Sequence, residues 1–139
     1  MIQTIATIAA DHVDLVSAKS FEDTARDLAA QLGRPSAWEL MGLLDWGGVL
    51  NLSGVAMKAL CFLIGDPVTA RALLAAGGPA VGLYLPVKML VYEAGDGTVH
   101  VAYDQLPLMA PSEDDALSVV AAGVDAALKE VACGAAGWG

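Results

Sequence analysis

Residues 87–104, VKMLVYEAGDGTVHVAYD, decide the fold of this chain. Apolar side chains alternate with mostly polar ones along residues 87–93 and again along residues 98–104. Alternation with a period of two is typical of a β-strand. Between the two runs, Gly95 and Gly97 flank Asp96 and give the backbone the freedom that a tight turn requires. The stretch therefore predicts an antiparallel β-hairpin.

Three helix starts are visible outside the hairpin. Ser20 is followed by two acids in the pattern of a capping box, which predicts a helix that ends at Gly33. Asp66 is a good N-cap and Pro67 suits the first helical position, so a second helix is expected from there to about Ala76. A third apolar stripe predicts a last helix over residues 112–132.

Three further segments read as strands, at residues 12–17, 38–45 and 59–64. The run at 38–45 is mostly apolar, so we expect it to be buried on both faces or to form a covered edge. Residues 46–54 are irregular and fit either a loop or a short helix. The apolar segment at 1–10 is either a paired strand or a frayed end, and the Gly/Ala-rich residues 133–139 are expected to form a loose tail.

The elements follow the order β-α-β-β-α-β-β-α. This order predicts one domain over residues 1–139 in the α/β (α+β) class. The expected architecture is a two-layer sandwich, with a mixed, mostly antiparallel sheet of about five strands and about three helices.

Composition excludes several classes of protein. The chain has 139 residues, of which 56% are apolar, and seven basic residues against sixteen acidic ones give a formal charge of −9. The apolar content argues against disorder. The acidic balance argues against binding to nucleic acid or to an anionic membrane surface, because both need a basic patch.

Two further features bear on location. The apolar start has no basic residue of the kind that opens a secretory signal, and the longest uncharged run, residues 72–87, is too short to cross a bilayer. We therefore expect a cytoplasmic protein. Cys61 and Cys133 are too few for a disulfide framework and are expected to be reduced thiols. The high apolar fraction favours a homodimer.

The middle of the chain carries FLIGDP at 62–67, GLYLPVKMLVYE at 82–93 and DGTVHVAY at 96–103, and the front half carries Ser20-Phe21-Glu22 and a strand that ends at Asp45. This ordered set resembles the bacterial and archaeal family of unknown function DUF302, and the resemblance is looser in the front half. It covers about residues 13–103. Asp66 replaces the usual Asn, which keeps the cap, while Trp46-Gly47-Gly48 departs from the small polar and alanine-rich residues expected there. The resemblance implies a two-layer α/β fold that tends to form homodimers, and it implies no activity.

The sequence offers little for a metal or a cofactor. Its two histidines, His12 and His100, lie on different predicted strands, and the spacings of cysteine and histidine typical of zinc sites are absent. An oxygen-ligand site at Asp11 and Asp14 is weaker still. No glycine-rich phosphate loop is present. We therefore expect no metal and no cofactor.

Nucleophilic catalysis has one candidate pair, Cys61 with His100, if their strands are neighbours. Cys61 lies in an apolar run, where a thiolate is disfavoured, so a buried core cysteine is the favoured interpretation. The polar face of the hairpin is a better candidate. Lys88, Tyr92, His100 and Asp104 fall on one side of the predicted strands, where they could hold a small anion, act as acid and base, or form a solvated face with cross-strand pairs.

The irregular segment carries the last candidates. Trp46 and Asn51, next to Asp45, could close over an apolar ligand or pack on a partner, and a tryptophan that fills the edge of the core is the alternative. The leading hypothesis is a homodimer that binds a small, partly apolar ligand between the sheet and the Trp46 segment or at the dimer seam. Its proposed ligand-binding residues are Trp46, Asn51, Lys88, Tyr92 and His100.

Two alternatives stay open. The first is a cofactor-independent enzyme that uses His100 as acid or base while Lys88 or Tyr92 holds developing negative charge. The second is a protein–protein interaction module without a ligand. A cavity lined by Lys88 and Tyr92 would count against the second alternative.

Overall fold

The computed structural model describes residues 12–33, 38–106 and 116–138. Five strands form one sheet in the order β1-β5-β4-β3-β2. Their bounds are β1 His12–Val16, β2 Glu39–Asp45, β3 Ala59–Gly65, β4 Val87–Glu93 and β5 Val99–Asp104. Every pair of neighbouring strands is antiparallel, so the expected α/β sandwich is confirmed while the sheet is antiparallel rather than mixed.

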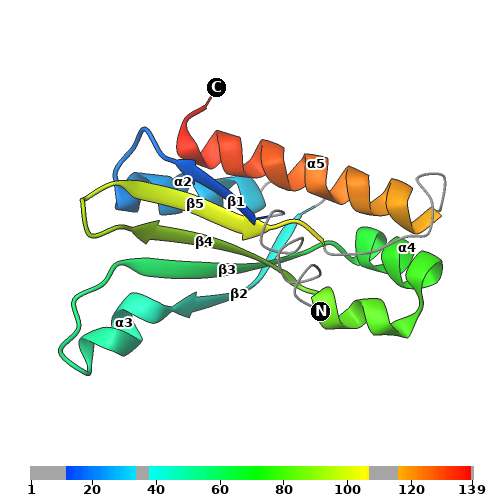
Figure 1. Cartoon of the computed structure of the whole chain (residues 1–139), viewed down its shortest axis with the longest axis horizontal. Coiled ribbons are helices and arrows are strands. Elements are labelled where there is room, and N and C mark those ends of the chain that lie inside the picture. Colours follow the sequence, from blue (N-terminus) through cyan, green and yellow to red (C-terminus); the bar gives the residue numbers. More distant parts are fainter. Residues whose placement is uncertain (1–11, 34–37, 107–115, 139) are drawn as a thin grey trace, which may run out of the picture.

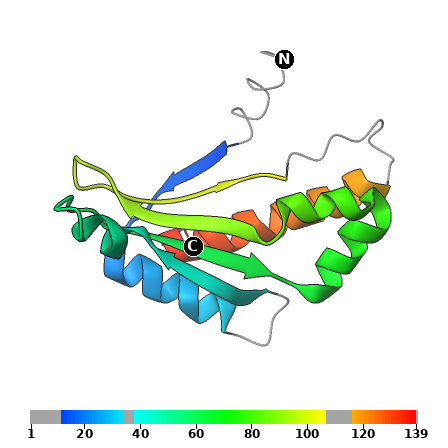
Figure 2. The same ribbon diagram turned by 90° about the horizontal axis from the view of Figure 1, so that it is seen from below.

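The helices form the second layer. The three long ones are α2 Phe21–Leu32, α4 Pro67–Gly77 and α5 Ala116–Ala136. α2 and α5 lie side by side on one face of the sheet, and α4 packs against the beginning of α5 (Figures 1 and 2). Two short pieces complete the chain: α3 Trp46–Asn51, and the 3₁₀ helix η1 Pro79–Tyr84, which the sequence analysis missed.

The core lies between the sheet and the helices. Met89, Val91 and Val101 point from the hairpin into this layer and have no exposed surface, as the alternation predicts. Leu28 of α2, Leu73 of α4 and Leu128 of α5 meet them and are also fully buried. Burial of each such side chain stabilises the fold by roughly 1.5–3 kcal/mol.

The capping signals operate as predicted. The hydroxyl of Ser20 accepts a hydrogen bond from the Asp23 N–H at 3.1 Å. The carboxylate of Asp66 accepts from the N–H groups of Val68 and Thr69 at 3.2 and 3.3 Å. These bonds satisfy backbone donors that have no partner inside the helix. The expected start of the last helix near Ser112 lies outside the described residues.

β2 differs from its prediction. It was expected to be buried or covered, yet it is the last strand of the sheet and most of its residues are exposed, with Met41 at 65% and Leu43 at 49%. A continuous apolar run is typical of a strand in the middle of a sheet, which has a neighbouring strand on each side. Here β3 pairs with one side of β2 only, within the described part of the chain.

The chain end also differs from its prediction. Residues 133–136 continue α5 instead of forming a loose tail, and Ala135 and Ala136 are fully buried. The Ala136 carbonyl accepts from the Ala18 N–H at 2.9 Å, and the Trp138 indole N–H donates to the Val16 carbonyl at 2.8 Å. Small side chains look tail-like in sequence, but here they allow α5 to approach the turn after β1 closely.

Candidate functional site

One face of the sheet is not covered by any helix of the described ranges and holds most of the predicted site residues (Figure 2). Tyr92 and His100 are directly opposite each other in the β4–β5 register. Lys88 and Asp104 lie four residues from them along the same strands and share that face, since side chains alternate with a period of two. The prediction that these four residues lie on one face is therefore confirmed in position. We call this surface the open face.

A hydrogen-bonded group on the open face, which we call the Asp14 cluster, contains Asp14, Tyr92, Asp96, Thr98 and His100. The Tyr92 hydroxyl donates to Asp14 Oδ2 at 2.6 Å, and His100 Nδ1 lies 2.7 Å from Asp14 Oδ1. The rings of Tyr92 and His100 stack, with centroids 4.8 Å apart and planes within 8°. On the other side, His100 Nε2 lies 2.8 Å from Thr98 Oγ1, which also donates to Asp96 Oδ1 at 2.6 Å.

The cluster shifts three pKa values, and that of Asp96 is lowered, mainly by the hydrogen bond from the Thr98 hydroxyl. Partial burial raises the pKa of Asp14, but the hydrogen bonds from Tyr92 and His100 outweigh it and leave that pKa below its usual value. The bond to Asp14 is also the main reason that the pKa of Tyr92 rises to about 12, with burial second. Asp14 is therefore a carboxylate at neutral pH, and Tyr92 stays protonated as its donor.

The donors and acceptors of the cluster can be assigned by counting the protons that its groups can donate. Thr98 has one hydroxyl proton, which it gives to Asp96. The contact between His100 and Thr98 is then a hydrogen bond only if His100 Nε2 carries a proton, while Nδ1 needs one for Asp14. Both ring nitrogens are occupied, so His100 acts as a general base only if one of these bonds breaks.

Lys88 lies apart from the Asp14 cluster. Four residues of strand separate it from Tyr92, a distance of about 13 Å. Asp104 is engaged with a different residue, because its Oδ1 lies 2.7 Å from His12 Nδ1. The four polar residues of the hairpin thus share a face without forming one site.

Trp46 and Asn51 lie on α3, at the end of the sheet opposite α4 (Figure 1). Asp45 caps this helix, since its Oδ1 accepts from the Gly48 N–H at 2.8 Å. Trp46 is 45% exposed, so it does not fill the edge of the core. In the described part of the chain, no side-chain hydrogen bond joins Trp46 or Asn51 to the Asp14 cluster.

The Cys61–His100 pair is wrong, because β4 lies between β3 and β5. Cys61 is opposite Leu90 on the open face and only 6% exposed, so its expected burial is confirmed although it lies outside the core between the sheet and the helices. Burial raises the pKa of its thiol, although the charge of Lys88 partly offsets this. Both cysteines are free thiols.

Sequence reasoning missed Asp14 as the centre of the cluster and weighed it only as a weak metal ligand. The position of Asp14 in the cluster depends on the pairing of β1 with β5, which places Val16 opposite His100. These two strands are far apart in the sequence. The alternation of residues 12–16 shows the face on which Asp14 lies but not its neighbour. Among the described residues, no group of three histidine, cysteine or acidic side chains could hold a metal ion.

A mostly apolar cavity of about 430 Å³ lies beside α4, and we call it the end cavity. Its lining comes from the start of β2, the end of β3, α4, and the segment that leads from η1 into β4. Trp38, Ile64, Leu73 and Leu85 are among its mostly apolar lining residues, and its two charged lining residues are Glu39 and Asp66. None of the five predicted ligand-binding residues lines it.

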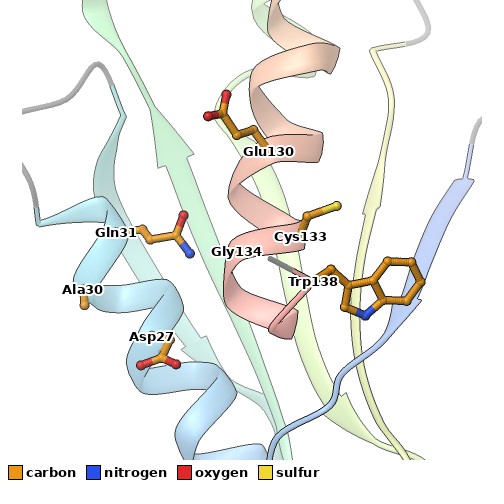
Figure 3. Close-up of a pocket in the computed structure, with 7 residues that line it drawn as sticks. All are labelled: Asp27, Ala30, Gln31, Glu130, Cys133, Gly134 and Trp138. Atoms are coloured by element: carbon orange, nitrogen blue, oxygen red, sulfur yellow. The ribbon is translucent and has the colours of Figure 1, made fainter.

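A larger hollow lies between α2 and α5 and holds about 690 Å³ (Figure 3). It is an open, polar groove with Asp27, Gln31 and Glu130 among its lining residues, and Gln31 points from α2 toward α5. Asp27 is bound by Lys19. Open polar grooves release little water from apolar surface, so size alone does not make this groove the better binding site.

Comparison with protein families decides the relationship. The model of the domain of unknown function DUF302 matches residues 13–133. The chain belongs to the DUF302 family. The match runs beyond the 13–103 region on which the resemblance was based and takes in most of α5, which fits the burial of this helix in the core.

The solved structures agree with this assignment. This DUF302 chain is similar to the crystal structure of an uncharacterized conserved DUF302 protein from Bacillus stearothermophilus, with a TM-score of 0.76 and 19% sequence identity. The similarity covers 90% of this chain and 98% of that one. At this identity it supports the fold alone. No curated protein matches the chain. No helix among the described residues is long and apolar enough to span a membrane.

Proposed function

We propose that this DUF302 domain binds a small, mostly apolar, uncharged molecule in the end cavity. The observation that carries the proposal is the cavity itself, whose volume of about 430 Å³ lies within the range of small-molecule sites. Burial of apolar ligand surface against side chains such as Leu73 and Trp38 would provide the main driving force.

The charges at the end cavity narrow the class of ligand. Its charged lining residues, Glu39 and Asp66, are both acids, so an anionic ligand is disfavoured. Asp66 is held in place because it caps α4 and accepts a hydrogen bond from the Thr69 hydroxyl at 2.5 Å. With few polar groups in the lining, the ligand would need few hydrogen-bonding groups of its own.

The test uses a neutral apolar fluorophore, N-phenyl-1-naphthylamine, and two matched substitutions in α4. Ala70 lines the end cavity, whereas Ala75 is exposed and does not line it. We expect Ala70→Leu to weaken binding about tenfold or more, since the added side chain takes up ligand space worth at least ~1.4 kcal/mol. Ala75→Leu should bind as the unmodified protein does. Equal binding by all three proteins contradicts the proposal.

A second cavity-filling variant guards against misfolding of the first. Gly82 also lines the end cavity, and a Cβ atom built there meets only Leu74 Cδ2, at 3.9 Å. Gly82→Leu therefore adds a side chain at the cavity lining without an initial clash. Each variant is used only if its thermal unfolding stays cooperative.

We also propose that the protein is a homodimer joined through β2. Nine of the sixteen exposed large apolar side chains in the described ranges lie between positions 40 and 57, on β2, α3 and the segment that follows. An exposed apolar edge strand is a template for pairing with another strand. The sequence of β2 is apolar between Glu39 and Asp45, so antiparallel pairing about Gly42 sets Leu40 against the partner's Leu44.

The two alternative functions have less support. An enzyme with His100 as acid or base must first break a hydrogen bond to Asp14 or Thr98. An interaction module without a ligand fits the exposed β2–α3 surface, and the fluorophore experiment separates it from the ligand-binding proposal. A cytoplasmic location is also proposed, and two free thiols support it.

A further inference from the structure

A third hollow lies on the open face, where η1 leads into β4 and where β5 ends. It holds about 510 Å³, and we call it the Lys88 groove. Most of its lining is apolar and includes Leu44, Leu63 and Pro86. The groups able to hydrogen-bond a ligand are the side chains of Tyr84, Lys88 and Gln105, with Asp104 at one side.

Three basic residues of the described ranges, Lys88 among them, have no ion-pair partner, and Lys88 is the one of these three that lines the groove. Sixteen acids accompany seven basic residues, and Lys19, Arg26 and Lys58 each have an acidic partner. Lys88 has no ion-pair partner within residues 12–33, 38–106 and 116–138. It is opposite Leu63 in the β3–β4 register, so its cross-strand neighbour on the open face is apolar.

The nearby acid does not neutralise Lys88. Asp104 Oδ1 lies 2.7 Å from His12 Nδ1, which directs this carboxylate toward β1. The charge of Lys88 does act on the open face, where it opposes the rise that burial causes in the pKa of the Cys61 thiol. The groove therefore presents one ammonium group beside apolar walls.

We propose that the Lys88 groove binds a small monocarboxylate with an apolar body, at a site separate from the end cavity. The carboxylate pairs with the Lys88 ammonium, and Gln105 and Tyr84 can donate further hydrogen bonds. The apolar body lies along Leu44, Leu63 and Pro86.

A carboxylate fits this groove better than a phosphate does. The lining contains one lysine and no arginine, whereas phosphate recognition in proteins usually combines several cationic or N–H donors. A dianion would also lose more hydration than one ammonium group returns beside an apolar wall. The neighbouring end cavity shares the Leu85–Pro86–Val87 segment as a wall but has acids at its rim, so the two cavities select ligands of different charge.

The test compares 4-phenylbutyrate with its amide, 4-phenylbutyramide, by titration calorimetry. The two molecules share an apolar body and differ in the charged group. In the unmodified protein we expect the carboxylate to bind about tenfold more tightly than the amide. In Lys88→Gln the ratio should fall to within about twofold, while Lys88→Arg and the control Lys129→Gln, an exposed lysine on α5, should keep it.

Equal binding of acid and amide by the unmodified protein, or an unchanged preference in Lys88→Gln, overturns the proposal. The outcome is distinguishable from failure of the end-cavity proposal. Ala70→Leu blocks the end cavity and should leave the affinity for 4-phenylbutyrate unchanged, because Ala70 does not line the Lys88 groove. Loss of 4-phenylbutyrate binding in Ala70→Leu would show that the acid occupies the end cavity instead.

Discussion

The two faces of the sheet use the same strands in opposite ways. On the covered face, Met89, Val91 and Val101 are fully buried under α2 and α5. On the open face, the alternate residues of the same strands include Lys88, Tyr92 and His100, which no helix in the described part of the chain covers. The difference teaches that stability is concentrated on one face, which leaves the other free to carry charges and hydrogen-bonded side chains.

Substitutions in adjacent residues of β4 give the largest expected contrast between the faces. Met89→Ala removes a fully buried side chain and should cost about 2–5 kcal/mol of unfolding free energy. Leu90→Ala, on the open face, should cost roughly 1 kcal/mol, since Leu90 is only partly buried. Urea unfolding of both variants measures the difference, and equal costs would contradict the two-face account.

The exposed edge at β2 gives the next effect. Leu43→Lys places a charge on an exposed strand, so it should leave the folded monomer stable while weakening the proposed dimer at least tenfold. Val119→Lys, on the exposed side of α5, is the control and should leave the dimer unchanged. Sedimentation equilibrium measures both.

The effect of salt on the proposed dimer gives a second test of the β2 interface. Pairing of β2 about Gly42 brings Glu39 near the partner's Asp45 at each end of the interface, so added salt should tighten the dimer by screening like charges. A monomeric protein at every concentration, or a dimer that Leu43→Lys leaves intact, argues against the β2 interface.

The Asp14 cluster gives a smaller effect on stability and a distinct spectroscopic one. Asp14→Asn removes the charged acceptor of Tyr92 and His100 and should cost about 1–2 kcal/mol. The pKa of Tyr92, about 12 in the intact cluster, should fall toward its ordinary value of about 10. Ultraviolet titration with Tyr92→Phe as the reference isolates this tyrosine.

The same carboxylate fixes the sign of one pH effect. The pKa of Asp14 is lower in the folded protein than in the unfolded chain, so its contribution to stability is present above the unfolded value of about 3.9. That contribution is lost as the pH falls through the lower, folded pKa. Asp14→Asn should therefore show a weaker loss of stability on acidification, and an identical acid profile would contradict the hydrogen bonds assigned to Asp14.

The features that could be predicted from the sequence are those set by residues close together along the chain. The hairpin and the caps at Ser20 and Asp66 depend on residues within a few positions of one another, and the structure confirms them. The Asp14 cluster depends on the pairing of β1 with β5, which no local pattern contains. The edge position of β2 depends on the strand order of the whole sheet.

The candidate sites follow the same rule. Alternation places Lys88, Tyr92 and His100 on one face, and spacing along the strand separates Lys88 from Tyr92. The strand register adds that His100 is opposite Tyr92 and is therefore also far from Lys88. The end cavity was missed because its lining comes from β2, β3, α4, η1 and α5, each of which looks like ordinary core in sequence. The sequence features that lie near the end cavity are the Asp66-Pro67 helix start and the turn that follows Gly77.

The central claim is that an uncharged apolar molecule binds in the end cavity, and methyl NMR during a titration with N-phenyl-1-naphthylamine tests it most directly. Leu73, Leu74 and Val124 line the cavity, whereas Val101 is fully buried in the core and does not line it. We predict saturable shifts of the three lining residues with Val101 unmoved. Shifts confined to β2 and α3, or no saturable shift at the lining residues, would contradict the claim.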